Sequence, residues 1–137
     1  MTLVVDASFA AAWFLPDERN PVADDVARRL TVDRALVPDL FRHELRNVLL
    51  MAFRRGRLSK DDCFDQLARA EGFALVSRGG GDAARIGSLT IEHRLSAYAA
   101  AYLSLAIEER ATLATCDAAL AAAAVPEGLT VVGLERA

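Results

Sequence analysis

Short apolar runs alternate with longer segments of helical periodicity along the whole chain. The runs lack the apolar–polar alternation of a half-exposed strand, which is typical of strands buried on both faces of a parallel sheet. They cover residues 3–5, 35–37, 73–76, 112–115 and 129–132. The helical pattern predicts helices at 9–15, 21–30, 39–55, 59–72, 82–94, 97–109 and 117–124.

Several of the predicted helices begin at residues that cap helices well. Asp39, Ser59 and Ser96 each stand at a predicted start, and Gly56 stands at a predicted end. Strands that alternate with helices imply right-handed crossovers. We therefore predict an α/β fold, a three-layer α/β/α sandwich with a central, mostly parallel five-stranded sheet. At 137 residues, the chain is expected to form one domain spanning 1–137.

Composition and charge narrow the class of protein. The chain is 53% hydrophobic and 26% charged, which is ordinary for a globular domain, and its net charge of −3 argues against binding nucleic acid through a basic surface. The longest uncharged stretch, residues 95–107, is too short to span a membrane, and Asp6 interrupts the first apolar run. The two cysteines, Cys63 and Cys116, form no disulfide framework. We expect a soluble, cytoplasmic protein without a membrane segment.

Two acids directly follow predicted strands. Asp6 comes after residues 3–5, and Asp117 comes just after residues 112–115. Parallel strands share a direction, so both acids should emerge at one edge of the sheet, where ligands bind in such folds. Each acid alone is equally well explained as the N-cap of the next helix.

Glu44 is a third candidate, at the border of the apolar face of the helix at 39–55. Asn47 lies three residues further on, so both side chains share one strip of that helix. The alternative is a solvated glutamate paired to Arg42 or Arg46. Carboxylates that converge usually hold a cation, and hard oxygen donors suit Mg²⁺ or Mn²⁺.

Other motifs carry less weight. His43 and Glu44 begin like a zinc-protease motif, but Asn47 stands where the second histidine is needed. The glycines at 79–81 lack the ending of a phosphate-binding loop. Aspartate-based phosphatases need a second acid where Ser8 stands. We expect His43 and His93 to be surface histidines or histidines with satisfied hydrogen bonds.

Four segments occur in the order and spacing of a known family: Val4–Ser8, Glu44 with Asn47, Leu95–Ala106 and Thr115–Asp117. Together they resemble the PIN-domain ribonucleases, over essentially the whole chain. Within that family the chain looks like a VapC-type toxin of a bacterial toxin–antitoxin system.

The resemblance implies a metal-dependent endoribonuclease, the toxin of a type II toxin–antitoxin pair, that cleaves RNA phosphodiester bonds with Mg²⁺ or Mn²⁺. Asp6 and Asp117 would be direct metal ligands. Glu44 would bind the metal through water or help position the nucleophile. The residues that would hydrogen-bond these carboxylates are Ser8, Asn47 and Thr115.

One position departs from the family. Its motif reads Leu-Ser-x-Tyr-Asp-Ala-x-Tyr-Leu, and this chain has Ala99 where the metal-binding aspartate belongs. The chain is then either a natural degenerate member or an engineered inactive variant. Because loss of even a supporting partner lowers metal affinity or activity about 10- to 100-fold, we predict a nearly inactive protein with an intact fold.

Two further functions stay open. One is a natural non-catalytic PIN-like module that binds RNA or a protein partner. The presence of Asp6, Glu44 and Asp117 favours the ribonuclease over it. The other is a metal-dependent phosphatase of another α/β family.

Partners follow from clustered arginines and from the resemblance. Five arginines are candidates for binding RNA phosphates: Arg42, Arg46, Arg54, Arg55 and Arg57. Their alternative is pairing with acids of the next helix, Asp61, Asp62 and Asp65. The resemblance also implies homodimers and capture by a VapB-like antitoxin. Trp13–Leu15 would either line the antitoxin groove or belong to the core.

Overall fold

Five short strands form the central sheet of the computed structural model, which describes residues 1–134. The strands are β1 (Thr2–Val5), β2 (Arg34–Val37), β3 (Val76–Ser77), β4 (Thr112–Ala114) and β5 (Val131–Val132). Their order across the sheet is β3-β2-β1-β4-β5, and every pairing is parallel. The predicted α/β sandwich is confirmed, with a sheet that is wholly rather than mostly parallel. Residues 135–137 of the expected domain lie outside the described residues.

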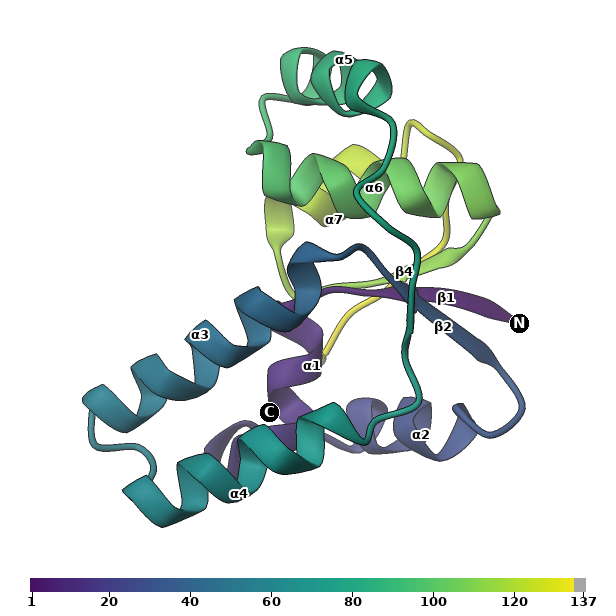
Figure 1. Ribbon diagram of the computed structural model, residues 1–137. Coiled ribbons are helices and arrows are strands. Elements are labelled where there is room, and N and C mark those ends of the chain that lie inside the picture. Colours follow the sequence, from purple (N-terminus) through teal and green to yellow (C-terminus); the bar gives the residue numbers. More distant parts are fainter. Residues whose placement is uncertain (135–137) are drawn as a thin grey trace.

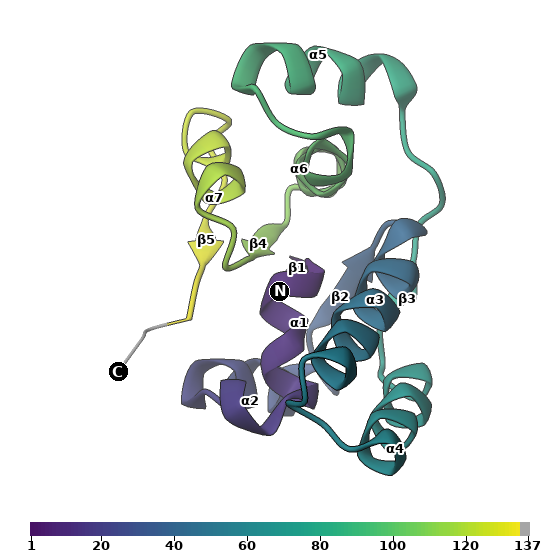
Figure 2. The ribbon, with the colours of Figure 1, turned by 90° about the vertical axis from the view of Figure 1, so that its left-hand side faces the viewer.

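Helices cover both faces of this sheet (Figures 1 and 2). α6 packs against β1 and β4 with α7 beside it, and α5 lies on the outer side of α6. α1, α2, α3 and α4 lie on the opposite side. The helices are α1 (Ala7–Phe14), the short 3₁₀ helix η1 (Pro16–Glu18), α2 (Pro21–Arg29), α3 (Leu40–Arg54), α4 (Lys60–Glu71), α5 (Ala83–His93), α6 (Ala97–Glu109) and α7 (Ala118–Ala124).

The central strand and the helix above it form the middle of the core. Val4 and Val5 of β1 are fully buried, as expected for a strand covered on both faces. α6 is buried over residues 100–106, because it lies between the sheet and α5. Its alanines let neighbouring elements approach closely. None of the helices in residues 1–134 is long and apolar enough to cross a membrane.

Two local expectations are wrong. The strand predicted at 73–76 is reduced to Val76–Ser77, because Phe73 turns its ring onto α1, where it stacks on Trp13 with 5.0 Å between centroids. Asp39 does not cap α3. Its backbone is already helical, and its carboxylate accepts a hydrogen bond of 2.7 Å from the Ser77 hydroxyl instead.

The segment Trp13–Leu15 belongs to the core, with each side chain at most 6% exposed. The same three residues also line one wall of a cavity of about 510 Å³. The expectation that this segment belongs to the core is therefore confirmed, and its role in a groove for a partner stays a prediction. α1 begins at Ala7, two residues before the predicted start, because Asp6 caps it.

Candidate active site

Asp6 stands at the carboxyl end of β1 and is only 5% exposed. Its backbone N–H donates to the carbonyl of Ala114, which fixes it beside β4. One carboxylate oxygen, Oδ1, accepts hydrogen bonds from the Phe9 N–H (2.9 Å) and the Ser8 hydroxyl (2.7 Å). The other, Oδ2, accepts one from the Thr115 hydroxyl. Asp6 is thus both the N-cap of α1 and a buried acid.

The surroundings of Asp6 push its pKa in both directions. Burial raises the pKa of Asp6 above its ordinary value, and the negative charge of Asp117 adds to this rise. The hydrogen bonds from Thr115, Phe9 and Ser8 lower it, but burial outweighs them. The structure therefore holds this carboxylate where its negative charge is poorly solvated, and a nearby cation would stabilise it.

Asp117 reaches the same edge from β4. Its Oδ1 accepts hydrogen bonds from the backbone N–H groups of Ala119 and Leu120, so it caps α7. Its own N–H donates to the Thr115 hydroxyl oxygen at 3.0 Å. Because that hydroxyl in turn donates to Asp6, Thr115 connects the two acids. The prediction that both aspartates emerge at one edge is confirmed.

Glu44 comes from α3 and faces the same edge. Its Oε1 accepts a hydrogen bond of 2.5 Å from the hydroxyl of Tyr102 on α6. Burial raises the pKa of Glu44, the bond from Tyr102 lowers it, and the charge of Asp6 raises it again, with a net rise. Burial also raises the pKa of Tyr102, as does its bond to Glu44, so the phenol keeps its proton and remains a donor.

Sequence reasoning missed Tyr102 as a site residue. The available signal was its position: Tyr102 lies three residues after Ala99, one helical turn along the same face of α6. Its side chain is only 2% exposed. A buried phenol needs a hydrogen-bond partner, and a carboxylate facing α6 supplies one here.

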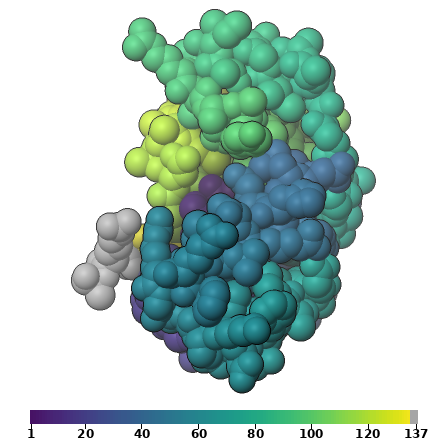
Figure 3. Space-filling model, turned by 60° about the vertical axis from the view of Figure 1, so that its left-hand side comes forward, coloured from purple at the N-terminus to yellow at the C-terminus, as the bar shows by residue number. Residues whose placement is uncertain are grey.

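One cavity of about 180 Å³ brings the candidate positions together. Asp6, Glu44, Asp117 and Ala99 all line it, with Tyr102 and Ser8 beside them. In Figure 3 the N-terminal part of the chain shows between α3, α6 and α7, the helices that surround this edge. Asn47 is exposed on α3 and is not among the residues that line the cavity.

The donor set matches a hard divalent cation in chemistry. Asp6, Glu44 and Asp117 offer oxygen ligands of the kind that Mg²⁺ and Mn²⁺ prefer. The ligand atoms of these three acids do not all lie within 4.8 Å of one another. Among residues 1–134, one group of three potential ligands does meet that spacing, elsewhere in the molecule. Ala99 contributes a methyl group to the fourth position. The residues thus fit the ion in type, with one carboxylate fewer than the family resemblance implies.

The arginines near the end of α3 differ in how they are engaged. Arg57 holds Asp17 through two hydrogen bonds of 2.8 Å and Glu18 through one of 2.7 Å. Arg54 and Arg55 are exposed, and neither forms an ion pair within the described part of the chain. Of this group, only these two guanidinium groups have no acidic partner there.

Two further arginines of α3 pair across to the end of α4. Arg46 donates to Glu71 at 2.7 Å, and Arg42 lies 3.9 Å from the same carboxylate. The expected pairing with the acids at the start of α4 is wrong. Helix α4 presents its last residue to α3 at this point, and residues 1–134 contain no ion pair that involves Asp61, Asp62 or Asp65.

Comparison with known proteins agrees with this architecture. The family model of the PIN domain matches residues 3–126. Ribonuclease VapC3 of Pyrobaculum aerophilum is 33% identical over 124 residues, which are 88% of this chain and 93% of the relative. Among solved structures, PAE2754 from Pyrobaculum aerophilum superimposes with a TM-score of 0.74 at 21% identity, covering 96% of this chain and 90% of the other.

A second solved structure is VapBC2 from Rickettsia felis, bound to a DNA fragment from its promoter. Its TM-score is 0.69 at 13% identity, and the match covers 98% of this chain and 100% of that one. The class of protein is defined by two observations. The parallel sheet gathers acids at one edge, and the model of the PIN domain matches most of the chain. The chain belongs to the PIN-domain family. Its identity to Ribonuclease VapC3 places it with the VapC-type members.

Proposed function

We propose that the chain is a metal-dependent endoribonuclease in design, a VapC-type toxin that cleaves RNA phosphodiester bonds. Asp6, Glu44 and Asp117 would hold Mg²⁺ or Mn²⁺, and Ala99 leaves the protein as it stands nearly inactive. The observation that carries this proposal is the cavity that three carboxylates and position 99 line together. The family relationship supports the same activity.

The bound ion would neutralise the negative charge that develops on the scissile phosphate. The chain's own residues orient the carboxylates. Ser8 and Thr115 hold both oxygens of Asp6 in place. Tyr102 fixes Oε1 of Glu44, which leaves Oε2 of Glu44 to accept a hydrogen bond from a water molecule. The raised pKa of Glu44 also makes it a better proton acceptor than an ordinary glutamate.

The second candidate function is a non-catalytic PIN-like module that binds RNA or a protein. Ala99 is the observation that favours it, because the family motif has an aspartate there and this chain has none. Both functions use the same fold. They differ in whether restoring one carboxylate restores cleavage.

Cleavage of mixed tRNA and rRNA by the Ala99→Asp protein tests the proposal. The chain as given and an Ala99→Asn variant, of matching size but without charge, serve as controls. We expect cutting by Ala99→Asp alone, in Mg²⁺ or Mn²⁺, and none with chelator. Cleavage by the asparagine variant as well would refute the role of the fourth carboxylate. No cleavage by any of the three, under conditions where Ala99→Asp is folded, would favour the binding module.

Three partners belong to the same proposal. The first is RNA, whose phosphates would bind to the exposed arginines Arg54 and Arg55. The second is a VapB-like antitoxin, since the Rickettsia felis neighbour is a VapBC complex. The cavity beside Trp13 and Phe14 offers an apolar wall for it, next to Arg69, whose guanidinium lies 5.1 Å from the Phe14 ring centre. The third is a second copy of this chain, as a homodimer.

A further inference from the structure

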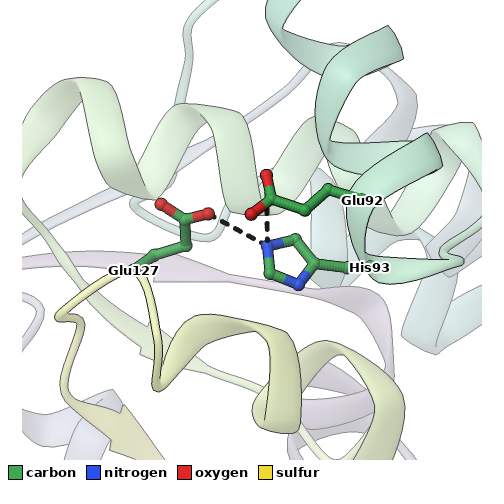
Figure 4. Close-up of side chains that lie close together, drawn as sticks. All are labelled: Glu92, His93 and Glu127. Carbon is green, nitrogen blue, oxygen red and sulfur yellow. Dashed lines mark hydrogen bonds and ion pairs between the residues drawn. The ribbon is translucent and has the colours of Figure 1, made fainter.

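Glu92, His93 and Glu127 converge on the side of the molecule where α5 ends (Figure 4). His93 is the last residue of α5, and Glu127 lies in the turn between α7 and β5. Nε2 of His93 lies 2.9 Å from Oε1 of Glu127 and 4.0 Å from Oε2 of Glu92. One ligand atom from each of the three residues lies within 4.8 Å of the other two. None of the three lines the acidic cavity.

The arrangement places more negative charge than one imidazole can balance. Nε2 carries at most one proton, so it donates to one carboxylate, and the second approaches it without a hydrogen bond. Neither Glu92 nor Glu127 forms an ion pair with an arginine or lysine in residues 1–134. The C-terminal end of α5 adds a partial negative charge at the same place. A cation at this point would therefore be favoured electrostatically.

The spacing also suits a single ion. Zinc binds imidazole nitrogen and carboxylate oxygen at about 2.0–2.2 Å, so ligand atoms around one ion lie within about 4.4 Å of each other. Small rotations of the glutamate side chains bridge the difference from the observed spacing. His93 and Glu127 have side chains 12% and 25% exposed, which anchors two ligands, while Glu92 is 65% exposed and adjustable.

We propose that Glu92, His93 and Glu127 form a second metal site, for a first-row transition metal such as Zn²⁺. One nitrogen and two oxygen donors favour such an ion over Mg²⁺, which prefers oxygen ligands alone. The site goes beyond the proposed nuclease function and does not depend on it. Its effect would be structural, because the ion would tie the end of α5 to the turn after α7, two segments that are 34 residues apart.

Zinc binding to the full chain tests this site. The titration uses a chromophoric zinc chelator as competitor, with Mg²⁺ in large excess to occupy hard oxygen sites. It is carried out in a Cys116→Ser background, which removes the exposed thiol. We expect one Zn²⁺ per chain. His93→Ala and Glu127→Gln should each weaken binding about 10-fold or more, and Zn²⁺ should raise the melting temperature of the parent only.

His43→Ala is the matched control, since residue 43 is the chain's other histidine and lies exposed on α3. It should bind zinc as tightly as the parent. Circular dichroism establishes that each variant is folded, and Glu92→Gln, which changes an exposed side chain, tests the site with little risk to folding. Equal zinc affinity in the parent and the His93→Ala variant would overturn the proposal. So would an absence of zinc binding by the folded parent, which would leave an ordinary histidine–glutamate pair.

Discussion

Restoring the fourth carboxylate should make the folded protein less stable without metal and more stable with it. Ala99 lies in the first turn of α6, and its N–H donates to the capping hydroxyl of Ser96 at 3.1 Å. In the Ala99→Asp variant, a new negative charge enters the cavity that Asp6, Glu44 and Asp117 already line. Two opposing effects then decide the free energy of unfolding.

Repulsion is the larger effect. Two unit charges 6–8 Å apart repel by about 2–3 kcal/mol at an effective dielectric constant near 20, and physiological salt screens this to about 1 kcal/mol per pair. An acid in the first turn of a helix gains only about 0.3–1 kcal/mol from the helix dipole. With three acidic neighbours, the repulsion less the gain from the dipole makes us expect Ala99→Asp to be less stable by about 2–3 kcal/mol. At roughly 3–5 °C per kcal/mol for a domain of this length, that lowers the melting temperature by about 6–15 °C.

Thermal unfolding of both proteins, in chelator and in Mg²⁺ or Mn²⁺, measures this balance. Ion at about 1,000 times its dissociation constant adds about 4.1 kcal/mol, enough to reverse the order of the two melting temperatures. The chain as given should respond much less to the same ion. A higher melting temperature for Ala99→Asp in metal-free buffer would refute the argument from repulsion.

Two other changes probe the same edge of the sheet, and a third probes the far end of α3. Tyr102→Phe removes the donor to Glu44, so the pKa of Glu44 should rise further and the fold should lose about 1–2 kcal/mol at neutral pH. The hydrogen bond from Tyr102 favours the ionised form of Glu44, so the loss of stability in Tyr102→Phe should shrink as pH falls through the pKa of Glu44. Urea unfolding at several pH values measures that loss, and carboxyl NMR measures the pKa. Asp6→Ala leaves three donors unpaired and should lower the free energy of unfolding by about 2–4 kcal/mol. Asp6→Asn, which keeps an acceptor oxygen, should lose less. Joint replacement of Arg54 and Arg55 by alanine should weaken RNA binding and flatten its salt dependence, and unchanged affinity and slope would discard the phosphate role.

The strand-end acids could be predicted from sequence for a simple reason. Asp6 and Asp117 each follow an apolar run, and parallel strands bring such positions to one edge whatever their order. That β1 and β4 are neighbours, and that Thr115 joins the two acids, depends on strand order, which local patterns do not encode. The helices at 59–72 and 97–109 were predictable because Ser59 and Ser96 cap them through bonds within four residues.

Contacts between distant segments explain what the sequence did not reveal. Phe73 looked like a strand residue, but its ring packs on Trp13, which is 60 positions away in the sequence. The sequence suggested that Arg57 pairs with acids of the next helix, but its guanidinium donates to Asp17, 40 residues earlier. Tyr102 reaches Glu44 across 58 residues. In each case tertiary packing determines which residue is the partner, and the spacing of residues close in sequence does not predict it.

Asp6 and Asp117 each hold the first turn of a helix as well as facing the cavity. Loss of an N-cap destabilises a protein by about 0.5–2 kcal/mol, so selection for a folded chain alone would retain a capping side chain at both positions without catalysis. Position 99 caps nothing, and alanine suits a helix, so a carboxylate there would be the one whose replacement harms the fold least. Glu44 also caps no helix. Of the three acids that line the cavity, Glu44 is therefore the one that helix capping does not explain.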